Sequence, residues 1–507
     1  MNAFQRLIMN RPRAMVALFG AATLFAGCAV GPDYRAPQAD APAQWRTTQT
    51  ASSTQATLAD GSADLQQWWT RLNDPLLDAL VNEAVAGNLD VASATARVRE
   101  ARAVLRQAGG ALYPSLNATG GFTRSGAGSS AVTTGSTTTT TVGASGPINL
   151  FQAGFDASWE IDLFGANRRA LEAARDGYDA AQWDRRTALL TLIGDVTTRY
   201  VQARGYQARL ALARETAASQ LETARLTRVR YTAGATSGLD AANAQGEAQS
   251  TLATIPALEA DYAQTVHSLA VLTGRTPDAL IERMAAPLPL TAPTPVPAPV
   301  PTPVPVPALP VARGVPADTL LARPDVRAAE RRYAQYTARV GQAEAARYPR
   351  VTLTGSLATS GTQFGDLARH SSIGWSIGPA VTIPLFDAGR LKAAVDIADA
   401  QREQYLIAWR SAVLTALTDV ENASVSLARE TERTQSLQLS ADAYGEAAKL
   451  AHARYESGST GFLDVLTADR SLYSAQDTLI QSRVSVTTDY IALNKALGGG
   501  WDGDTTR

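Results

Sequence analysis

Apolar and polar residues alternate over four stretches of the chain, two in each half, at residues 115–123, 153–164, 350–360 and 372–385. A period of two predicts strands with one apolar face. Each first strand follows a Tyr-Pro pair, Tyr113-Pro114 and Tyr348-Pro349, where the proline disfavours continuation of a helix. Aromatic residues near the strand ends are typical of lipid-facing strands. A soluble hairpin with one buried face is the alternative.

A helical period replaces the alternation after each strand pair. Residues 167–232 and 389–457 contain no proline, and small or apolar residues recur at steps of three and four. Helices of this length would each measure about 100 Å at 1.5 Å per residue. Return helices are predicted over 239–273 and 462–497, where Gly274 and Gly498 provide the stop. Such helices suit a coiled-coil tunnel better than one globular domain.

The turns between these helices share a pattern. The first turn (residues 230–245) and the second turn (residues 454–473) match at five positions, each 224 residues apart, from 231 to 455 for the first of them. The matched residues are Tyr231 and Tyr455, Gly234 and Gly458, Thr236 and Thr460, Leu239 and Leu463, and Asp240 and Asp464. This internal repeat predicts two equivalent helical hairpins.

The N-terminus reads as a targeting segment. A basic start and an apolar run, Ala14 to Phe25, precede Cys28. Small residues directly before a cysteine resemble the lipobox of bacterial lipoproteins, in which Cys28 would become the lipidated first residue. An ordinary signal peptide with a chance cysteine is the alternative. Ala29, rather than an aspartate, would favour the outer membrane, and no run of about 18 apolar residues follows.

The resulting domain prediction has six parts. They are a signal peptide over 1–27, a lipidated N-terminal segment over 28–66, a first repeat over 67–286, a Pro-rich linker over 287–316, a second repeat over 317–499 and a tail over 500–507. Proline at nearly every second position in the linker favours polyproline II, a semi-rigid spacer.

The composition argues against several classes of function. The net charge of −1 gives no basic field for nucleic acid, and one cysteine allows no disulfide within the chain. The three histidines are scattered without metal-ligand spacing. We find no catalytic constellation and no cofactor motif, and so expect neither an enzyme nor a metal or cofactor site. Because four strands are too few for a barrel of about eight or more, several chains would have to contribute strands.

These pieces in this order resemble the TolC-type outer membrane factors, and among them the NodT-type efflux lipoproteins related to OprM. The resemblance is carried by Cys28 with Val30-Gly31-Pro32-Asp33-Tyr34, by Trp68-Trp69 with Asp74-Pro75, by the Tyr-Pro pairs, by Pro384 to Gly389 and by the two turns. It implies an α+β membrane protein: a homotrimer whose twelve strands form a transmembrane β-barrel continuous with a long α-helical coiled-coil barrel. It also implies a lipid anchor in the outer membrane, a periplasmic adaptor (membrane fusion) protein and an inner-membrane RND pump.

The resemblance places the gate at the two turns, which would form the periplasmic mouth. An aspartate of the second turn lines the constriction in the family, and Asp464 falls there, with Asp240 as its counterpart. Leu239 and Leu463 would form an apolar plug beside them. A plainer interpretation is also open, since an acid in the first turn of a helix is stabilised by the helix dipole.

The glycine turns are the candidate adaptor contacts: Gly234, Thr236, Gly458 and Thr460. A second aspartate and a basic turn residue of some members fall at Thr467 and Thr460, so the TolC latch is not expected. The predicted function is an outer membrane channel for small-molecule efflux. An exit duct for an ABC-type (type I) secretion system and a coiled-coil lipoprotein without a pore are the alternatives.

Overall fold

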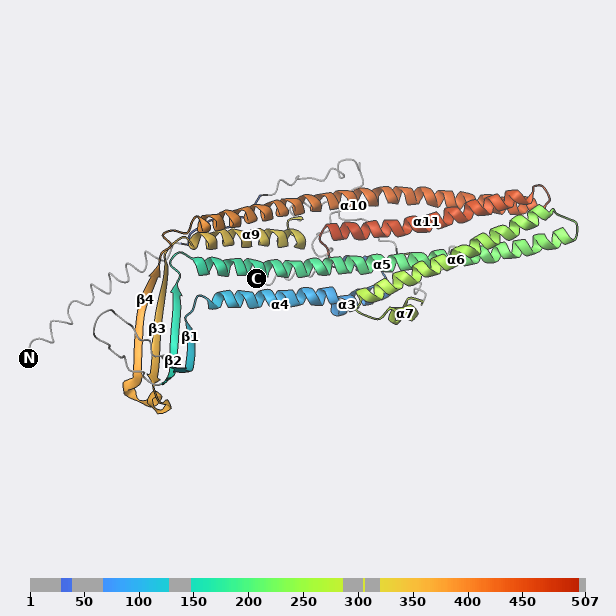
Figure 1. The fold of residues 1–507 in the computed structure, drawn as a ribbon. Coiled ribbons are helices and arrows are strands. Elements are labelled where there is room, and N and C mark those ends of the chain that lie inside the picture. The colour runs from blue at the N-terminus through green and yellow to red at the C-terminus, as the bar shows by residue number, and fades with distance from the viewer. Residues whose placement is uncertain (1–28, 39–66, 127–146, 286–303, 306–319, 501–507) are drawn as a thin grey trace, which may run out of the picture. The chain divides into compact units, whose positions relative to one another are not determined.

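The computed structural model describes residues 29–38, 67–126, 147–285, 304–305 and 320–500 (Figure 1). Cys28, the signal peptide and most of the Pro-rich linker lie outside the described residues. The chain divides into two compact units, and each takes residues from both sequence repeats. The first unit comprises residues up to 37, 99–179 and 330–407, and the second comprises 38–98, 180–329 and 408–507.

The first unit contains one antiparallel sheet of four strands in the order β1-β2-β3-β4. Its strands are β1 (Ser115–Ser125), β2 (Ile148–Ile161), β3 (Arg350–Gly361) and β4 (Ile373–Thr382). Every expected strand therefore overlaps one in the structure. The β2–β3 pairing joins the two sequence repeats, with Trp159 opposite Leu353.

Two strands, β2 and β4, differ from the expected bounds by three residues or more at one end at least. β2 begins at Ile148, five residues before the expected start, because Ile148 still pairs with the last residue of β1. It stops at Ile161, and the next residue, Asp162, accepts a hydrogen bond from the Arg168 amide at 2.8 Å in the first turn of the following helix. β4 stops at Thr382 rather than 385, because Thr382 pairs with Arg350, the first residue of β3.

The helical prediction is confirmed. Helices α5 (Ala166–Thr232) and α10 (Arg390–Glu456) have 67 residues each, and the return helices α6 (Gly238–Leu272) and α11 (Phe462–Ala496) have 35 each. Gly274 and Gly498, just past the return helices, have φ of 71° and 79°, as C-terminal glycines should. α6 continues through Pro256. None of the helices in the described part of the chain has an apolar stretch long enough to cross a membrane.

Shorter elements complete the two units. The helices are α3 (Pro75–Gly87), α4 (Leu89–Gly110), α7 (Ile281–Ala285) and α9 (Pro324–Ala345), with 3₁₀ helices η2 (Trp68–Leu72), η3 (Pro277–Leu280), η4 (Phe364–Ala368) and η5 (His370–Ser372). η4 and η5 occupy the expected loop between β3 and β4. Asp74 caps α3, and its carboxylate accepts from the Leu76 amide at 3.0 Å.

A buried polar network holds the second unit together. The Tyr200 hydroxyl donates to Asp74 and accepts from Arg204 Nε at 3.0 Å. All three side chains are almost fully buried, and Arg204 Nη1 also reaches the Met284 carbonyl at 3.4 Å. Burial raises the pKa of Tyr200, so its hydroxyl stays protonated. The network joins α5 to the cap of α3 and to α7.

We expect Tyr200→Phe to destabilise the second unit. Without the hydroxyl, a buried carboxylate oxygen and a buried guanidinium N–H lose a partner, which costs about 1–3 kcal/mol. The urea midpoint of helical circular dichroism should fall, whereas Tyr444→Phe, at a side chain that is 44% exposed, should leave it unchanged. An equal midpoint for both variants would contradict a stabilising role for the network.

Candidate functional site

The two predicted turns have the same backbone. Gly234 and Gly458 adopt φ of 75° and 72°, the left-handed conformation that favours glycine. In both turns the amide after the glycine bonds to the carbonyl five residues earlier at 2.8 Å, which is a Schellman motif. No atom lies within 4 Å of a Cβ built on either glycine. The turns are therefore exposed as well as equivalent.

The Asp240 carboxylate is hydrogen-bonded at the start of α6. It accepts from the Thr236 hydroxyl at 2.8 Å and from the Ser237 amide at 3.4 Å, while the Ser237 hydroxyl accepts from the Asp240 amide. This is a capping box. The hydrogen bonds from Thr236 and Ser237 hold the pKa of Asp240 below its usual range. The helix-start interpretation of Asp240 therefore has direct support.

Asp464 has a different environment. The N-cap of α11 is Gly461, which has no side chain to form a capping box, and no described residue donates to the Asp464 carboxylate. The side chain is exposed. Thr460, the counterpart of Thr236, has a buried hydroxyl without a partner. Leu463 and Leu239, beside the two aspartates, are 63% and 69% exposed. The second turn thus presents a carboxylate that no local contact uses.

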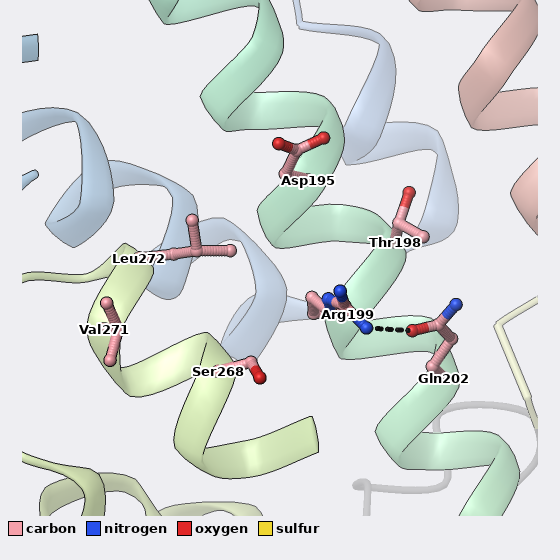
Figure 2. Close-up of a pocket in the computed structure, with 7 residues that line it drawn as sticks. All are labelled: Asp195, Thr198, Arg199, Gln202, Ser268, Val271 and Leu272. Atoms are coloured by element: carbon pink, nitrogen blue, oxygen red, sulfur yellow. Dashed lines mark hydrogen bonds between the residues drawn. The ribbon is translucent and has the colours of Figure 1, made fainter. Parts of the chain in front are cut away.

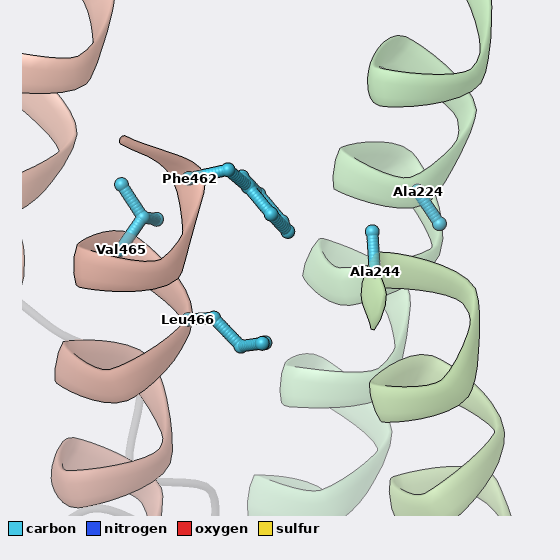
Figure 3. Close-up of a cluster of buried hydrophobic side chains, with 5 residues drawn as sticks. All are labelled: Ala224, Ala244, Phe462, Val465 and Leu466. Atoms are coloured by element: carbon cyan, nitrogen blue, oxygen red, sulfur yellow. The ribbon is translucent and has the colours of Figure 1, made fainter. Parts of the chain in front are cut away.

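An apolar cluster joins the two hairpins near these turns. Phe462, Val465 and Leu466 of α11 face Ala224 of α5 and Ala244 of α6, and all five are buried (Figure 3). Alanine on two helices leaves room for the phenyl ring. Burial of this apolar surface favours keeping the hairpins together.

Polar contacts reinforce the same junction. Arg470 on α11 donates to Glu247 on α6 at 2.6 Å. The Arg230 guanidinium lies over the Tyr455 ring, 5.1 Å from its centroid. Within the second hairpin, His452 Nε2 and Asp469 Oδ1 are 2.9 Å apart. These pairs could not be predicted from the sequence, because their members lie on different helices and no local spacing reports them.

The Asp240 cap, in contrast, has a signal in the local sequence. Ser237 followed three residues later by Asp240 matches the capping-box pattern that marks a helix start. The second turn has Gly461 at the corresponding position, so the repeat breaks at this residue. The difference between Ser237 and Gly461 is visible in the sequence, and it separates the two aspartates.

A hollow of about 480 Å³ opens between α5 and α6 (Figure 2). Its charged side chains already have partners: Asp195 lies 3.3 Å from Lys495, and Arg199 donates to Gln202 at 3.3 Å. Ser268, Val271 and Leu272 line the α6 side. Asp195 thus has an ion-pair partner and Arg199 a hydrogen-bond partner within the helices themselves. Among the described residues, no cluster of three or more His, Cys, Asp or Glu could hold a metal ion.

A family profile described as "Outer membrane efflux protein" matches residues 80–275 and 315–499. The chain belongs to the outer membrane efflux protein family. It is an outer membrane channel for efflux, and it extends into the periplasm. The two matched segments each contain one strand pair and one helical hairpin.

The similar proteins match this chain over almost its whole length. Nodulation protein T of Rhizobium leguminosarum bv. trifolii is 34% identical over 485 residues, covering 94% of this chain and 96% of the relative. The pyoverdine export outer membrane protein OpmQ of Pseudomonas aeruginosa is 30% identical, covering 96% and 97%. The outer-membrane channel OprN superposes with a TM-score of 0.78 at 31% identity, covering 94% of this chain and all of OprN.

We expect the two turns of this family member to respond differently to substitution. Ser237→Ala and Asp240→Ala should each cost about 1 kcal/mol of local stability and speed amide hydrogen exchange at the start of α6. Asp464→Ala should leave exchange at the start of α11 unchanged. Because the pKa of Asp240 is lowered, its cap stabilises α6 above the ordinary aspartate pKa, and this stability is lost as pH falls through the lowered value. Faster exchange in α11 of Asp464→Ala would show that it too is a cap.

Proposed function

We propose that this channel exports small molecules delivered by a periplasmic adaptor and an inner-membrane RND pump, and that it works as a homotrimer anchored by acylation of Cys28. The activity is conduction, with no covalent step. The observation that carries the proposal is the pair of exposed turns with the same backbone conformation, each followed by a Leu-Asp pair at a helix start. The names of similar proteins refer to different exported compounds, pyoverdine and toluene among them, so the cargo would be chosen mainly by the pump.

Two surfaces support assembly of several copies. β1 and β4 each pair on one side only among the described strands, and open sheet edges are not stable in lipid. On α10, four exposed apolar residues recur at steps of eleven and fourteen residues: Leu414, Val425, Leu439 and Leu450. These multiples of a helical period place them along one face. A second copy of the chain would cover both the edge and this face.

The gate would depend mainly on Asp464 and Leu463. A ring of exposed carboxylates favours cations, and a ring of leucines beside it would narrow and dry the opening. Asp240 would contribute less to the field, since its charge is engaged by Thr236 and Ser237. Opening would require the second hairpin to move away from the axis, against the contacts of Phe462 and Arg470 with the first hairpin.

We expect Asp464→Ala to raise single-channel conductance and to weaken cation preference in planar bilayers, because it removes three carboxylates from the constriction. Asp240→Ala should change the current less. Asp464→Asn, which keeps the size but removes the charge, separates charge from volume. Currents of all three variants equal to those of the unaltered channel would remove both aspartates from the gate.

Crosslinking from the turns tests the partners. A photoreactive residue at Ala235 or Ser459 should capture an adaptor of an RND-type pump in cells, because both positions lie in exposed turns. Position Ala36, in the N-terminal segment, is the control. An adaptor of an ABC-type exporter would transfer the function to protein or peptide secretion. Equal capture at all three positions would remove the turns from the adaptor contact.

A further inference from the structure

The chain leaves the sheet twice through the same short sequence. At the end of β2 it reads Ile161-Asp162-Leu163-Phe164, and at the end of β4 it reads Ile383-Pro384-Leu385-Phe386. A glycine of positive φ follows each phenylalanine, Gly165 at 85° and Gly389 at 83°, and a long helix begins next to it. The second junction has two more residues before its glycine. The phenylalanines of the two junctions are therefore counterparts in the repeat.

Phe164 has an aromatic partner within the chain. Its ring stacks on that of Tyr348, with the centroids 4.7 Å apart and the ring planes at 22°. Tyr348 stands just before β3, the strand that pairs with β2. The last pair of that ladder is Ile161 opposite Val351, and three further residues along each strand lead to Phe164 and Tyr348. The stack therefore continues the β2–β3 pairing past the ends of both strands.

Phe386 makes no such stack among the described residues. Its side chain is 92% exposed, and the neighbouring Leu385 is 91% exposed. Tyr113, which stands before β1 as Tyr348 stands before β3, is 74% exposed. β1 and β4 are the two edge strands of the sheet (Figure 1). The two exposed rings therefore lie beside the ends of the two strands that have a neighbour on one side only.

We propose that Phe386 of one copy of the chain stacks on Tyr113 of the next copy, and that β4 and β1 of the two copies pair in the register of β2 and β3. The inference rests on the assembly of several copies proposed above, and it adds the contact residues and the register. The same register places Ile377 opposite Phe122 of the next copy, as Phe155 lies opposite Leu357 within the chain. The contact buries two aromatic rings that one chain leaves exposed.

This register is compatible with a closed barrel. Opposite residues lead from Leu116 on β1 through Ala157 and Gly355 to Ile377 on β4, and the proposed pairing continues to Phe122 of the next copy. The path thus advances six residues, from 116 to 122, over four strands. Six residues measure about 20 Å and four strand spacings about 19 Å, which gives a strand tilt of about 45°. Transmembrane barrels have tilts of about 35–45°. Because six is even, Phe122 also lies on the same face of the sheet as Leu116.

The test uses the full-length chain with the two substitutions Phe386→Cys and Tyr113→Cys. The matched control carries Phe164→Cys and Tyr348→Cys, because the proposal gives the two pairs the same geometry. A short bis-maleimide that links the control pair within the chain, as peptide mapping reports, is applied to membranes that contain the first variant. We expect covalent dimers and trimers on denaturing gels. The single variants Phe386→Cys and Tyr113→Cys, which also contain Cys28, should give neither.

Two results would overturn the proposal, and they differ in what else they affect. A three-chain species that the reagent does not link at this pair would refute the proposed contact and leave the assembly intact. A chain that remains single in membranes would refute the contact and the assembly together. The efflux proposal has its own test in the adaptor crosslinks, so its failure is distinct from both results.

A second set of variants tests whether the stack stabilises the assembly. We expect the three-chain species of Phe386→Ala to dissociate at a lower temperature in detergent than that of the unaltered chain. Phe386→Tyr keeps an aromatic ring and should restore the higher temperature. Phe364→Ala removes a ring that is 74% exposed in the loop between β3 and β4, and it should have no effect. Equal dissociation temperatures for Phe386→Ala and Phe364→Ala would contradict a stabilising contact at Phe386.

Discussion

The unpaired edges of one four-stranded sheet are the constraint on which the rest of the structure depends. β1 and β4 have partners on one side only among the described strands, and in lipid every backbone N–H and C=O must be paired. A chain of the outer membrane efflux protein family therefore cannot be complete by itself in the bilayer. The exposed apolar residues of α10 likewise indicate that the helices pack against another copy of the chain. We propose that the single chain is one part of a closed assembly.

The turns of the two hairpins have the same backbone conformation, but their aspartates make different contacts. Gly234 and Gly458 produce the same turn, yet only the first turn is followed by a serine at the N-cap. Ser237 and Asp240 form a capping box at the start of α6, which engages the Asp240 carboxylate. Gly461 leaves Asp464 exposed. The two copies of the repeat thus differ: the aspartate of the first turn caps a helix, and the aspartate of the second turn is exposed.

Most of the fold could be predicted from the sequence. Long proline-free runs with a helical period located α5 and α10 almost to the residue, and the alternating period located all four strands. The start of β2 was misplaced because strand length depends on pairing with β1, which no local pattern reports. The Arg470–Glu247 contact joins residues far apart in sequence, so only the packed helices reveal it. The Ser237–Asp240 cap was local and could have been predicted.

The central claim is that copies of this chain close into a conducting channel. The most direct measurement combines native mass spectrometry of the purified protein with planar-bilayer recording of the same species. The account predicts a species of three chains that carries long-lived, cation-preferring currents. A stable monomer that conducts equally well, or a three-chain species that carries no current under any applied voltage, would contradict it.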